Sequence, residues 1–170
     1  MKRTLLFLFL TLTLLVAVGL YLERRARIET EHRGLDETTS PEMRLGLHEL
    51  KYFVSEKKPL RTPETHTYPT RQPMHSFSLS GTWQFDDSYV ELVNAPGNLR
   101  LHFQAGTVLM DAESLDPITI TIVVDGREHG TITVHDPKLY TLFDSPPNKE
   151  HQLHIKIPEP GLKIRKFTFS

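Results

Sequence analysis

Histidine and acidic side chains are the residues of this chain that could bind a metal ion or move a proton. The 170 residues include 9 histidines and 21 acidic residues. His151 and His154 are three positions apart, and on a strand such residues point to opposite faces, so they cannot share one ion. Asp111, Glu113 and Asp116 lack the ligand spacing and the turn glycine of a calcium loop. We therefore expect no metal site.

Motifs for covalent or acid–base catalysis are equally scarce. The chain has no cysteine, which excludes disulfides, thiolate zinc sites, iron–sulfur clusters and reactive thiols. It also has no Gly-x-Ser-x-Gly elbow, phosphate-binding glycine loop or His-Glu-x-x-His helix. Asp86 and Asp87 are adjacent in a turn and cannot flank a glycosidic bond. Catalytic groups on distant strands leave no sequence signature, so a hydrolase stays an alternative, but we expect no enzyme and no cofactor.

A row of polar residues is the first candidate for ligand contact. Arg100, His102 and Gln104 alternate with apolar residues and point away from Leu101. Such a row can form the floor of a groove on one sheet, or it can simply face solvent. We take Arg100 and His102 as candidate ligand-binding residues.

Two aromatic residues complete the set of candidate ligand-binding residues. Tyr140 has a ring that can pack and a hydroxyl that can reach a ligand, although a place in the core or at a sheet edge is favoured. Trp83 is the only tryptophan and could stack on a sugar ring. Its alternation with Phe77, Leu79 and Phe85 instead favours core packing.

The elements that must position these residues are strands. From Ser76 onward, large apolar side chains alternate with polar ones at a period of two. Turn signals such as Asp125-Gly126 separate eight or nine short runs, and they include residues 95–98 and 145–148. This pattern predicts an all-β fold, and two packed sheets favour a jelly-roll-like β-sandwich over a barrel. The expected domain covers residues 60–170.

The segment before the sandwich predicts a stalk with one short helix. Residues 23–40 carry many charges and few large apolar side chains. Ser40 and Pro41 are a favourable helix start, and apolar residues then recur at helical spacing from Met43 to Val54. We expect a stalk over residues 23–59 with an amphipathic helix at about 41–56. Four prolines make residues 57–75 extended connecting chain.

The N-terminus predicts a membrane anchor. Lys2 and Arg3 precede an uncharged apolar run that ends at Leu22, long enough as a helix to span about 27 Å. Residues 1–22 are therefore a transmembrane anchor, or else a signal peptide cut after Gly19. The basic residues that follow the run favour a cytoplasmic domain, but we expect the domain on the periplasmic or outer side. The formal net charge of −1 implies no nucleic-acid partner.

Several short motifs together resemble one known family. They are Thr62-Pro63-Glu64-Thr65, Leu79-Ser80-Gly81-Thr82-Trp83, the run from Leu99 to Ala105, Val124-Asp125-Gly126, the run from Leu139 to Leu142 and Phe167-Thr168-Phe169. In this order they resemble the C-terminal domain of DipZ-type proteins, over roughly residues 60–170. The resemblance implies a β-sandwich similar to carbohydrate-binding modules, which in that family follows a thioredoxin domain outside the cytoplasm.

The resemblance also has limits that shape the expected function. Without cysteine, and with some 35 residues between anchor and sandwich, the chain has no thioredoxin domain, so redox activity is not implied. We expect a membrane-tethered recognition module whose partner is a carbohydrate or cell-envelope glycan. The alternative is an accessory module that binds a separately encoded thioredoxin-like or cytochrome-maturation protein.

Overall fold

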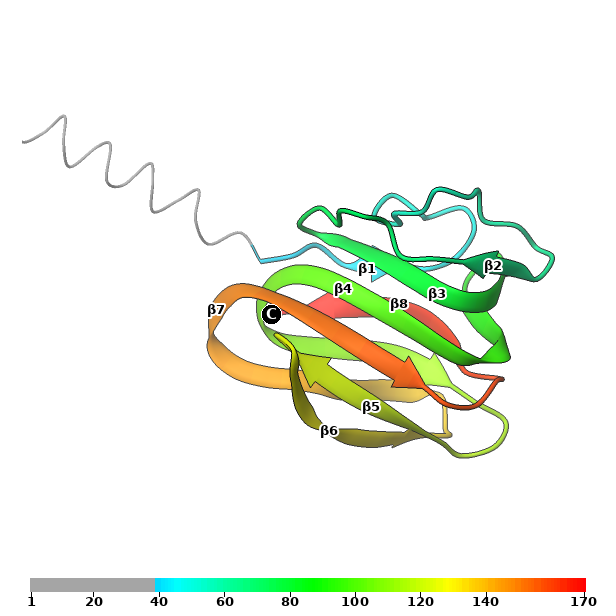
Figure 1. Cartoon of the computed structure of the whole chain (residues 1–170). Coiled ribbons are helices and arrows are strands. Elements are labelled where there is room, and N and C mark those ends of the chain that lie inside the picture. Colours follow the sequence, from blue (N-terminus) through cyan, green and yellow to red (C-terminus); the bar gives the residue numbers. More distant parts are fainter. Residues whose placement is uncertain (1–38) are drawn as a thin grey trace, which may run out of the picture. The chain divides into compact units, whose positions relative to one another are not determined.

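The computed structural model describes residues 39–170, and every regular element in that part of the chain is a strand. The predicted all-β class is confirmed (Figure 1). The predicted membrane anchor at residues 1–22 and the first part of the predicted stalk lie outside the described residues. Within residues 39–170, no helix is long and apolar enough to cross a membrane.

The strands pair into one eight-stranded sheet whose ladders are all antiparallel. The order along its main path is β1-β8-β4-β7-β5-β6, and β3 joins β4 and carries β2. The jelly-roll arrangement stays a prediction. The strand bounds are β1 Met43–Arg44, β2 Glu64–His66, β3 Ser76–Phe85, β4 Val90–Glu113, β5 Ile118–Val124, β6 Arg127–Val134, β7 Lys138–Ile157 and β8 Lys163–Phe169.

Two strands are much longer than the alternating pattern predicts. β4 has 24 residues and β7 has 20. The predicted turns at 95–98 and 145–148 lie inside them, which corrects that expectation. Proline and glycine mark these segments, and here they bend a strand without reversing it. The register of β4 shifts near Gly106, between its pairs with the two ends of β7.

The bends of β4 and β7 divide the sheet into two halves. The β3–β5 half consists of β3, residues 97–105 of β4, residues 149–157 of β7 and β5. The β1–β8 half consists of β1, β8, residues 107–113 of β4 and residues 138–144 of β7. Alternate residues of both halves are buried, so each half has one core face and one outer face.

The core is built by the alternation found in the sequence. Trp83, Phe77, Phe85, Phe103 and Phe167 are all fully buried. They belong to one apolar cluster that draws on every strand from β3 to β8. Burying a side chain of this size stabilises the fold by roughly 1.5 to 3 kcal/mol.

Residues 41–56 form no helix, so this sequence-based prediction is wrong. Met43 pairs with Phe167 through β1, and Met43 and Leu45 are both fully buried, at the two-residue spacing of a strand. Phe53 forms a bridge to Phe77 on β3. Gly46 lies against the backbone of Asp87, where a Cβ atom would clash. Tertiary packing therefore overrides the helical spacing, and the segment is part of the β-domain.

Candidate functional site

The outer face of the β3–β5 half carries the polar row predicted from the sequence. Arg100 lies opposite His154, Asn98 lies opposite Lys156, and His102 lies opposite Gln152. The apolar neighbours of these residues in both strands are buried, so the six polar side chains point outward. We call this surface the polar face and define it by Asn98, Arg100, His102, Gln152, His154 and Lys156.

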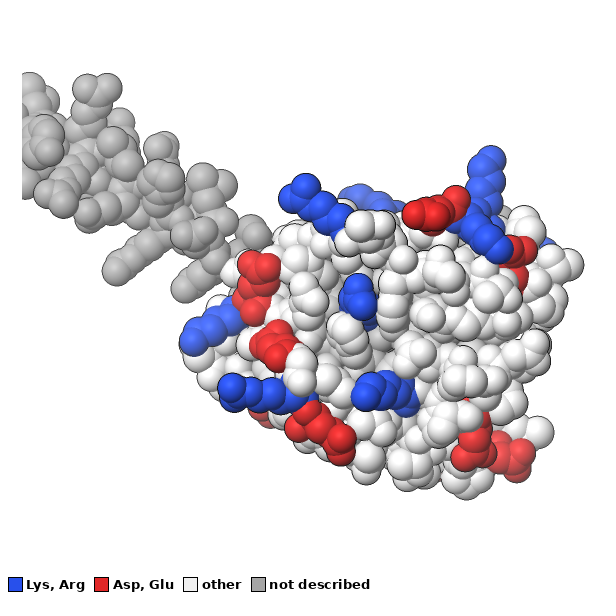
Figure 2. All heavy atoms as spheres, in the orientation of Figure 1, with Lys and Arg blue, Asp and Glu red and all other residues white. Residues whose placement is uncertain are grey.

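A segment of the chain itself covers one side of the polar face. The Gln72 side chain donates to the backbone oxygens of Ser76 at 3.0 Å and Arg100 at 3.1 Å, and it accepts a hydrogen bond from the Ser78 hydroxyl at 2.7 Å. These bonds fix residues 68–75 over β3 and β4. The β4–β7 side of the polar face stays partly exposed. Figure 2 shows one side of the domain, with charged groups separated by wide uncharged areas.

Arg100 is held on an aromatic ring from the covering segment. Its guanidinium carbon lies 4.1 Å from the centre of the Tyr68 ring, within the range of a cation–π contact. The Nε atom of Arg100 and the hydroxyl of Tyr68 are both buried and have no hydrogen-bond partner. Burial raises the pKa of Tyr68 to about 12, against the opposing effect of Arg100. Tyr68 is therefore neutral at pH 7 and can donate a hydrogen bond.

Two histidines flank Arg100 on the polar face. His102 contacts the Gln72 carbonyl through Nδ1 at 3.1 Å and a Glu150 carboxylate oxygen through Nε2 at 2.8 Å, which orients its ring. His154 lies beside Tyr68, with their ring centres 6.3 Å apart. Burial, and then the positive charges of Arg100 and Lys156, lower the pKa of His154 below its usual value. Within the described part of the chain, no carboxylate acts against that shift.

The two aromatic candidates from the sequence lie away from the polar face and are not exposed. Trp83 is fully buried, and its indole nitrogen donates to the backbone oxygen of Ser80 at 3.0 Å. Tyr140 is 6% exposed, and its hydroxyl accepts from the backbone N–H of His135 and donates to the Asp136 carbonyl. Neither ring offers a free surface to a ligand, which corrects both predictions. Each side chain instead stabilises the core and an adjoining turn.

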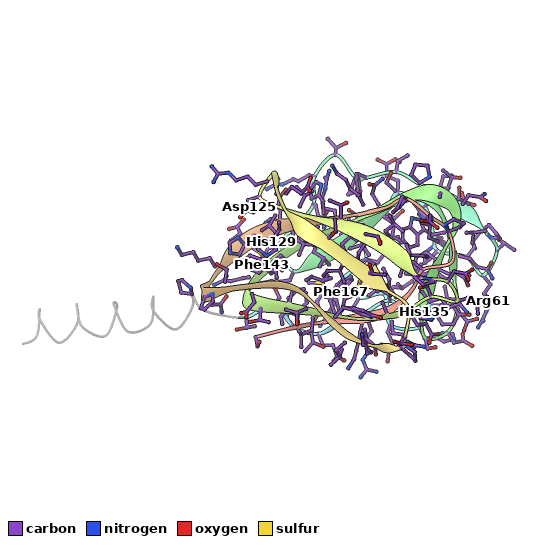
Figure 3. All side chains as sticks on the ribbon, turned by 90° about the horizontal axis from the view of Figure 1, so that it is seen from below. Arg61, Asp125, His129, His135, Phe143 and Phe167 are labelled. Carbon is purple, nitrogen blue, oxygen red and sulfur yellow. The ribbon has the colours of Figure 1, made fainter. Side chains whose placement is uncertain are left out.

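A second cluster lies in a hollow beside the β5–β6 turn. Asp125 accepts hydrogen bonds from His151 Nδ1 at 2.6 Å and from the backbone N–H of Gln152 at 2.9 Å. Burial alone would raise the pKa of Asp125, but these bonds outweigh burial and lower it. The Phe143 ring lies 4.8 Å from His151 and 5.5 Å from His129. Figure 3 shows Asp125, His129 and Phe143 together at one end of the domain.

That hollow has a volume of about 510 Å³ and is also lined by Ser145. An acid, an imidazole and a hydroxyl are the groups of a hydrolytic triad. Within residues 39–170, however, no hydrogen bond joins Ser145 to His151, and such a bond is what activates a serine nucleophile. His151 and His154 lie on opposite faces of β7, as the strand period predicts, because His151 packs on the core ring of Phe103.

A third candidate is a cleft at the opposite end, where Figure 3 shows His135. Its volume is about 450 Å³, and Glu91, Glu113 and Lys163 line it. Both glutamates pair with Lys163 in the sheet, and Asp116 also lines the cleft, so three carboxylates share it. The bond from Arg165 to Glu113 at 2.7 Å lowers the pKa of Glu113. A general acid for glycoside hydrolysis needs a raised pKa, so Glu113 does not fit that role.

The sequence missed the residues that complete the polar face. Tyr68 comes from a proline-rich segment whose path over the sheet has no local signal. The sequence-based predictions include His154 only as a possible metal ligand. A signal for it was present, because the alternation of β7 places His154 on the same face as Gln152 and Lys156.

Solved structures with a similar fold include two carbohydrate esterases of family two. The enzyme from Clostridium thermocellum, in complex with cellohexaose, is 16% identical with a TM-score of 0.52, over 56% of this chain and 31% of the esterase. The enzyme from Cellvibrio japonicus is 15% identical with a TM-score of 0.52, over 55% of this chain and 30% of the esterase. The chain thus spans less than a third of these esterases, and the likeness shows the fold alone.

Sequence comparisons place the β-domain in a family. A search of curated proteins finds no match. The family model described as thioredoxin-like C-terminal domain matches residues 40–170, which are most of the chain. This range agrees with the β-domain of the structure, including the segment before residue 60. The chain therefore belongs to the family of thioredoxin-like C-terminal domains, to which its sequence motifs point.

Proposed function

We propose that the chain is a non-catalytic recognition module that binds a carbohydrate or cell-envelope glycan on its polar face. One observation carries this proposal: the Tyr68–Arg100 pair lies beside an open row of outward polar side chains. Sugars are bound by hydrogen-bonding side chains set next to aromatic or apolar surface. The polar face combines donors from Arg100, Lys156 and Gln152 with the ring of Tyr68.

A role without catalysis is supported by the other two candidate sites. Glu113 in the end cleft is tied to Arg165 and has a lowered pKa. In the hollow, Asp125 orients His151, but Ser145 forms no hydrogen bond to it in the described part of the chain. A carbohydrate-related role is supported, through the fold alone, by the two family-two carbohydrate esterases.

A glycan array probed with the full-length chain in a mild detergent tests this function. We expect binding to a set of chemically related glycans, and at least a tenfold loss with Tyr68→Ala, which removes the support of Arg100. The matched control is Tyr52→Ala, because Tyr52 is a partly buried tyrosine outside the polar face. Binding to no glycan, or equal binding by both variants, would contradict the proposal.

The location of the module is part of the same proposal. An uncleaved apolar segment at residues 4–22 would tether the domain to a membrane, with the polar face exposed to the periplasm or the cell exterior. Protease added to intact spheroplasts should then digest the domain, while alkaline carbonate should leave the chain in the membrane pellet. Full protection from the protease would place the domain in the cytoplasm and contradict this part of the proposal.

A protein-interaction module is the second candidate function, and membership of a thioredoxin-like C-terminal domain family favours it. It predicts a complex with a separately encoded thioredoxin-like protein. A flat apolar surface near residues 41–75 would be its expected docking site. Among the large hydrophobic side chains that are exposed in residues 39–170, only Leu60 lies in that range. The glycan-binding function is therefore the better supported of the two.

A further inference from the structure

The charge of Arg100 has no counter-charge in the described part of the chain. No ion pair joins Arg100 to an acidic side chain within residues 39–170, and none joins Lys156. The acidic group next along the polar face, Glu150, is bound to His102. An arginine is always charged at physiological pH. The polar face therefore holds a permanent positive charge that a ligand could neutralise.

The neighbours of Arg100 strengthen this positive character. The pKa of His154 is influenced by the charges of Arg100 and Lys156 and by no carboxylate of residues 39–170. Tyr68 is neutral, so its ring packs against Arg100 without adding a negative charge. Asn98 and Gln152 are uncharged. The groups that face Arg100 from β4, from β7 and from the covering segment thus include no free anion.

The position of Arg100 suits an anion with two oxygens. Its guanidinium lies against the Tyr68 ring, which restricts the planar group to one orientation. Its terminal nitrogens form no hydrogen bond within residues 39–170, and they are not among the buried atoms that lack a partner. Planar guanidinium groups bind carboxylate and phosphate through two parallel hydrogen bonds.

We infer that the polar face binds an acidic glycan, and that Arg100 binds its carboxylate or phosphate group while Lys156 lies beside that group. This inference rests on the proposed glycan-binding function and names the ligand class. A glycan fits better than an acidic peptide, because exposed Leu60, Leu115 and Leu139 lie outside the strand segments of the polar face. Protein interfaces usually have a buried apolar core.

The experiment is a calorimetric titration of the full-length chain in a mild detergent at low salt. Hexagalacturonate supplies carboxylates, and pentamannose 6-phosphate supplies a phosphate. Two neutral glycans are the controls. One is the same hexagalacturonate with its carboxylates reduced to alcohols, and the other is unphosphorylated mannopentaose. Hexa-aspartate provides the same charges on a peptide.

We expect at least one acidic glycan to bind tenfold or more tightly than its neutral counterpart. Arg100→Met should remove that difference, and Arg100→Lys should restore only part of it, because lysine lacks the planar fork. The control Arg127→Met removes the same charge from an exposed position on β6 and should bind like the wild type. Near-ultraviolet circular dichroism would verify that each variant keeps the native core.

The possible failures are distinct. If the neutral glycans bind as tightly as the acidic ones, the acidic-ligand inference is wrong and the glycan-binding function stands. If no glycan binds, both are wrong. If only hexa-aspartate binds and the binding depends on Arg100, the polar face is a site for acidic protein segments, which also overturns both. If Arg127→Met loses binding as Arg100→Met does, the attraction is general and the assignment to Arg100 is overturned.

Discussion

The outer faces of the two halves of the sheet differ in whether their arginine side chains form ion pairs. On the β1–β8 half, Lys166 binds Glu42 at 2.8 Å, and Arg165 binds both Asp111 at 3.3 Å and Glu113 at 2.7 Å. We call this surface the paired face and define it by Glu42, Arg44, Asp111, Glu113, Arg165 and Lys166. On the polar face, Arg100 contacts a tyrosine ring and forms no ion pair with an acidic side chain of residues 39–170.

This difference separates charged groups that stabilise the fold from charged groups that a ligand can contact. The ion pairs of the paired face lie at partly exposed positions, where each contributes about 0.2 to 1 kcal/mol. Their charges are already neutralised. Arg100 instead has a buried Nε atom without a partner, and such a group costs stability. This contrast between the two faces is the reason why we propose the polar face, and not the paired face, as the ligand-binding surface.

The largest expected effect comes from a substitution that gives Arg100 an acidic partner within the domain. His154 lies opposite Arg100 in the sheet, so His154→Glu should form a cross-strand ion pair and compete with any acidic ligand. We expect at least a tenfold loss of acidic-glycan binding and a gain of about 0.2 to 1 kcal/mol in the free energy of unfolding. Titration and urea unfolding measure the two effects. His154→Gln is the control and should bind within about threefold of wild type.

The second prediction compares the stability of two arginine variants. Arg165→Met leaves Asp111 and Glu113 without their partner and should lower the free energy of unfolding by about 1 kcal/mol. Arg100→Met removes an unpartnered buried nitrogen, and we expect a change within about 0.5 kcal/mol. Urea unfolding of the two variants side by side provides the test. An equal loss in both variants would show that the arginines of the two faces contribute equally to the free energy of unfolding.

The two faces should also lose stability in different pH ranges. The pKa of His154 is lowered in the folded state, chiefly by burial, so the unfolded chain takes up this proton first. Stability from neutral His154 is therefore lost as the pH falls below about 6.5, the ordinary histidine value. The pKa of Glu42 is lowered chiefly by its bond to Lys166, and that contribution is lost only below about 4.5.

Unfolding experiments across pH can assign these ranges to residues. His154→Gln should reduce the loss of stability as the pH falls below about 6.5, and Lys166→Met should reduce the loss below about pH 4.5. His66 also has a pKa lowered by burial, so part of the first loss should remain in His154→Gln. Matching curves for wild type and His154→Gln would contradict the buried, neutral state of this histidine.

The smallest expected effect concerns the tyrosine under Arg100. Tyr68→Phe removes a buried hydroxyl that has no partner in the described structure but keeps the ring that supports Arg100. Stability should stay the same or rise slightly, and acidic-glycan binding should stay within about threefold of the wild type. Thermal unfolding and titration measure both. A larger loss of stability than this would mean that the hydroxyl has a structural partner.

The sequence predicted most of the strand segments because their signal is local. Alternation of Leu99, Leu101 and Phe103 with Arg100 and His102 determined which side chains point outward. Turns with their own chemistry were also predictable, as at Asp125-Gly126, where both residues have positive φ angles of 50° and 77°. These features depend on neighbours along the chain, so pattern analysis can reach them.

The features that the sequence did not predict depend on distant contacts. Met43 and Leu47 have helical spacing, but the chain pairs Met43 with Phe167 instead. Residues 95–98 and 145–148 carry turn residues, but the long strands continue through them. The Tyr68–Arg100 pair joins a proline-rich segment to a strand more than thirty positions away. No local pattern encodes which strand that segment covers.

The central claim is that the unpaired Arg100 of the polar face is the group that an acidic glycan contacts. The most direct measurement is the NMR signal of the arginine Nε–Hε groups of the full-length chain in detergent micelles, recorded during a titration with hexagalacturonate. We predict that the Arg100 signal shifts, because the ligand binds the same guanidinium group, while the signals of Arg44 and Arg165 stay in place. A titration that shifts Arg165 and leaves Arg100 unchanged, or that shifts neither, would contradict the claim.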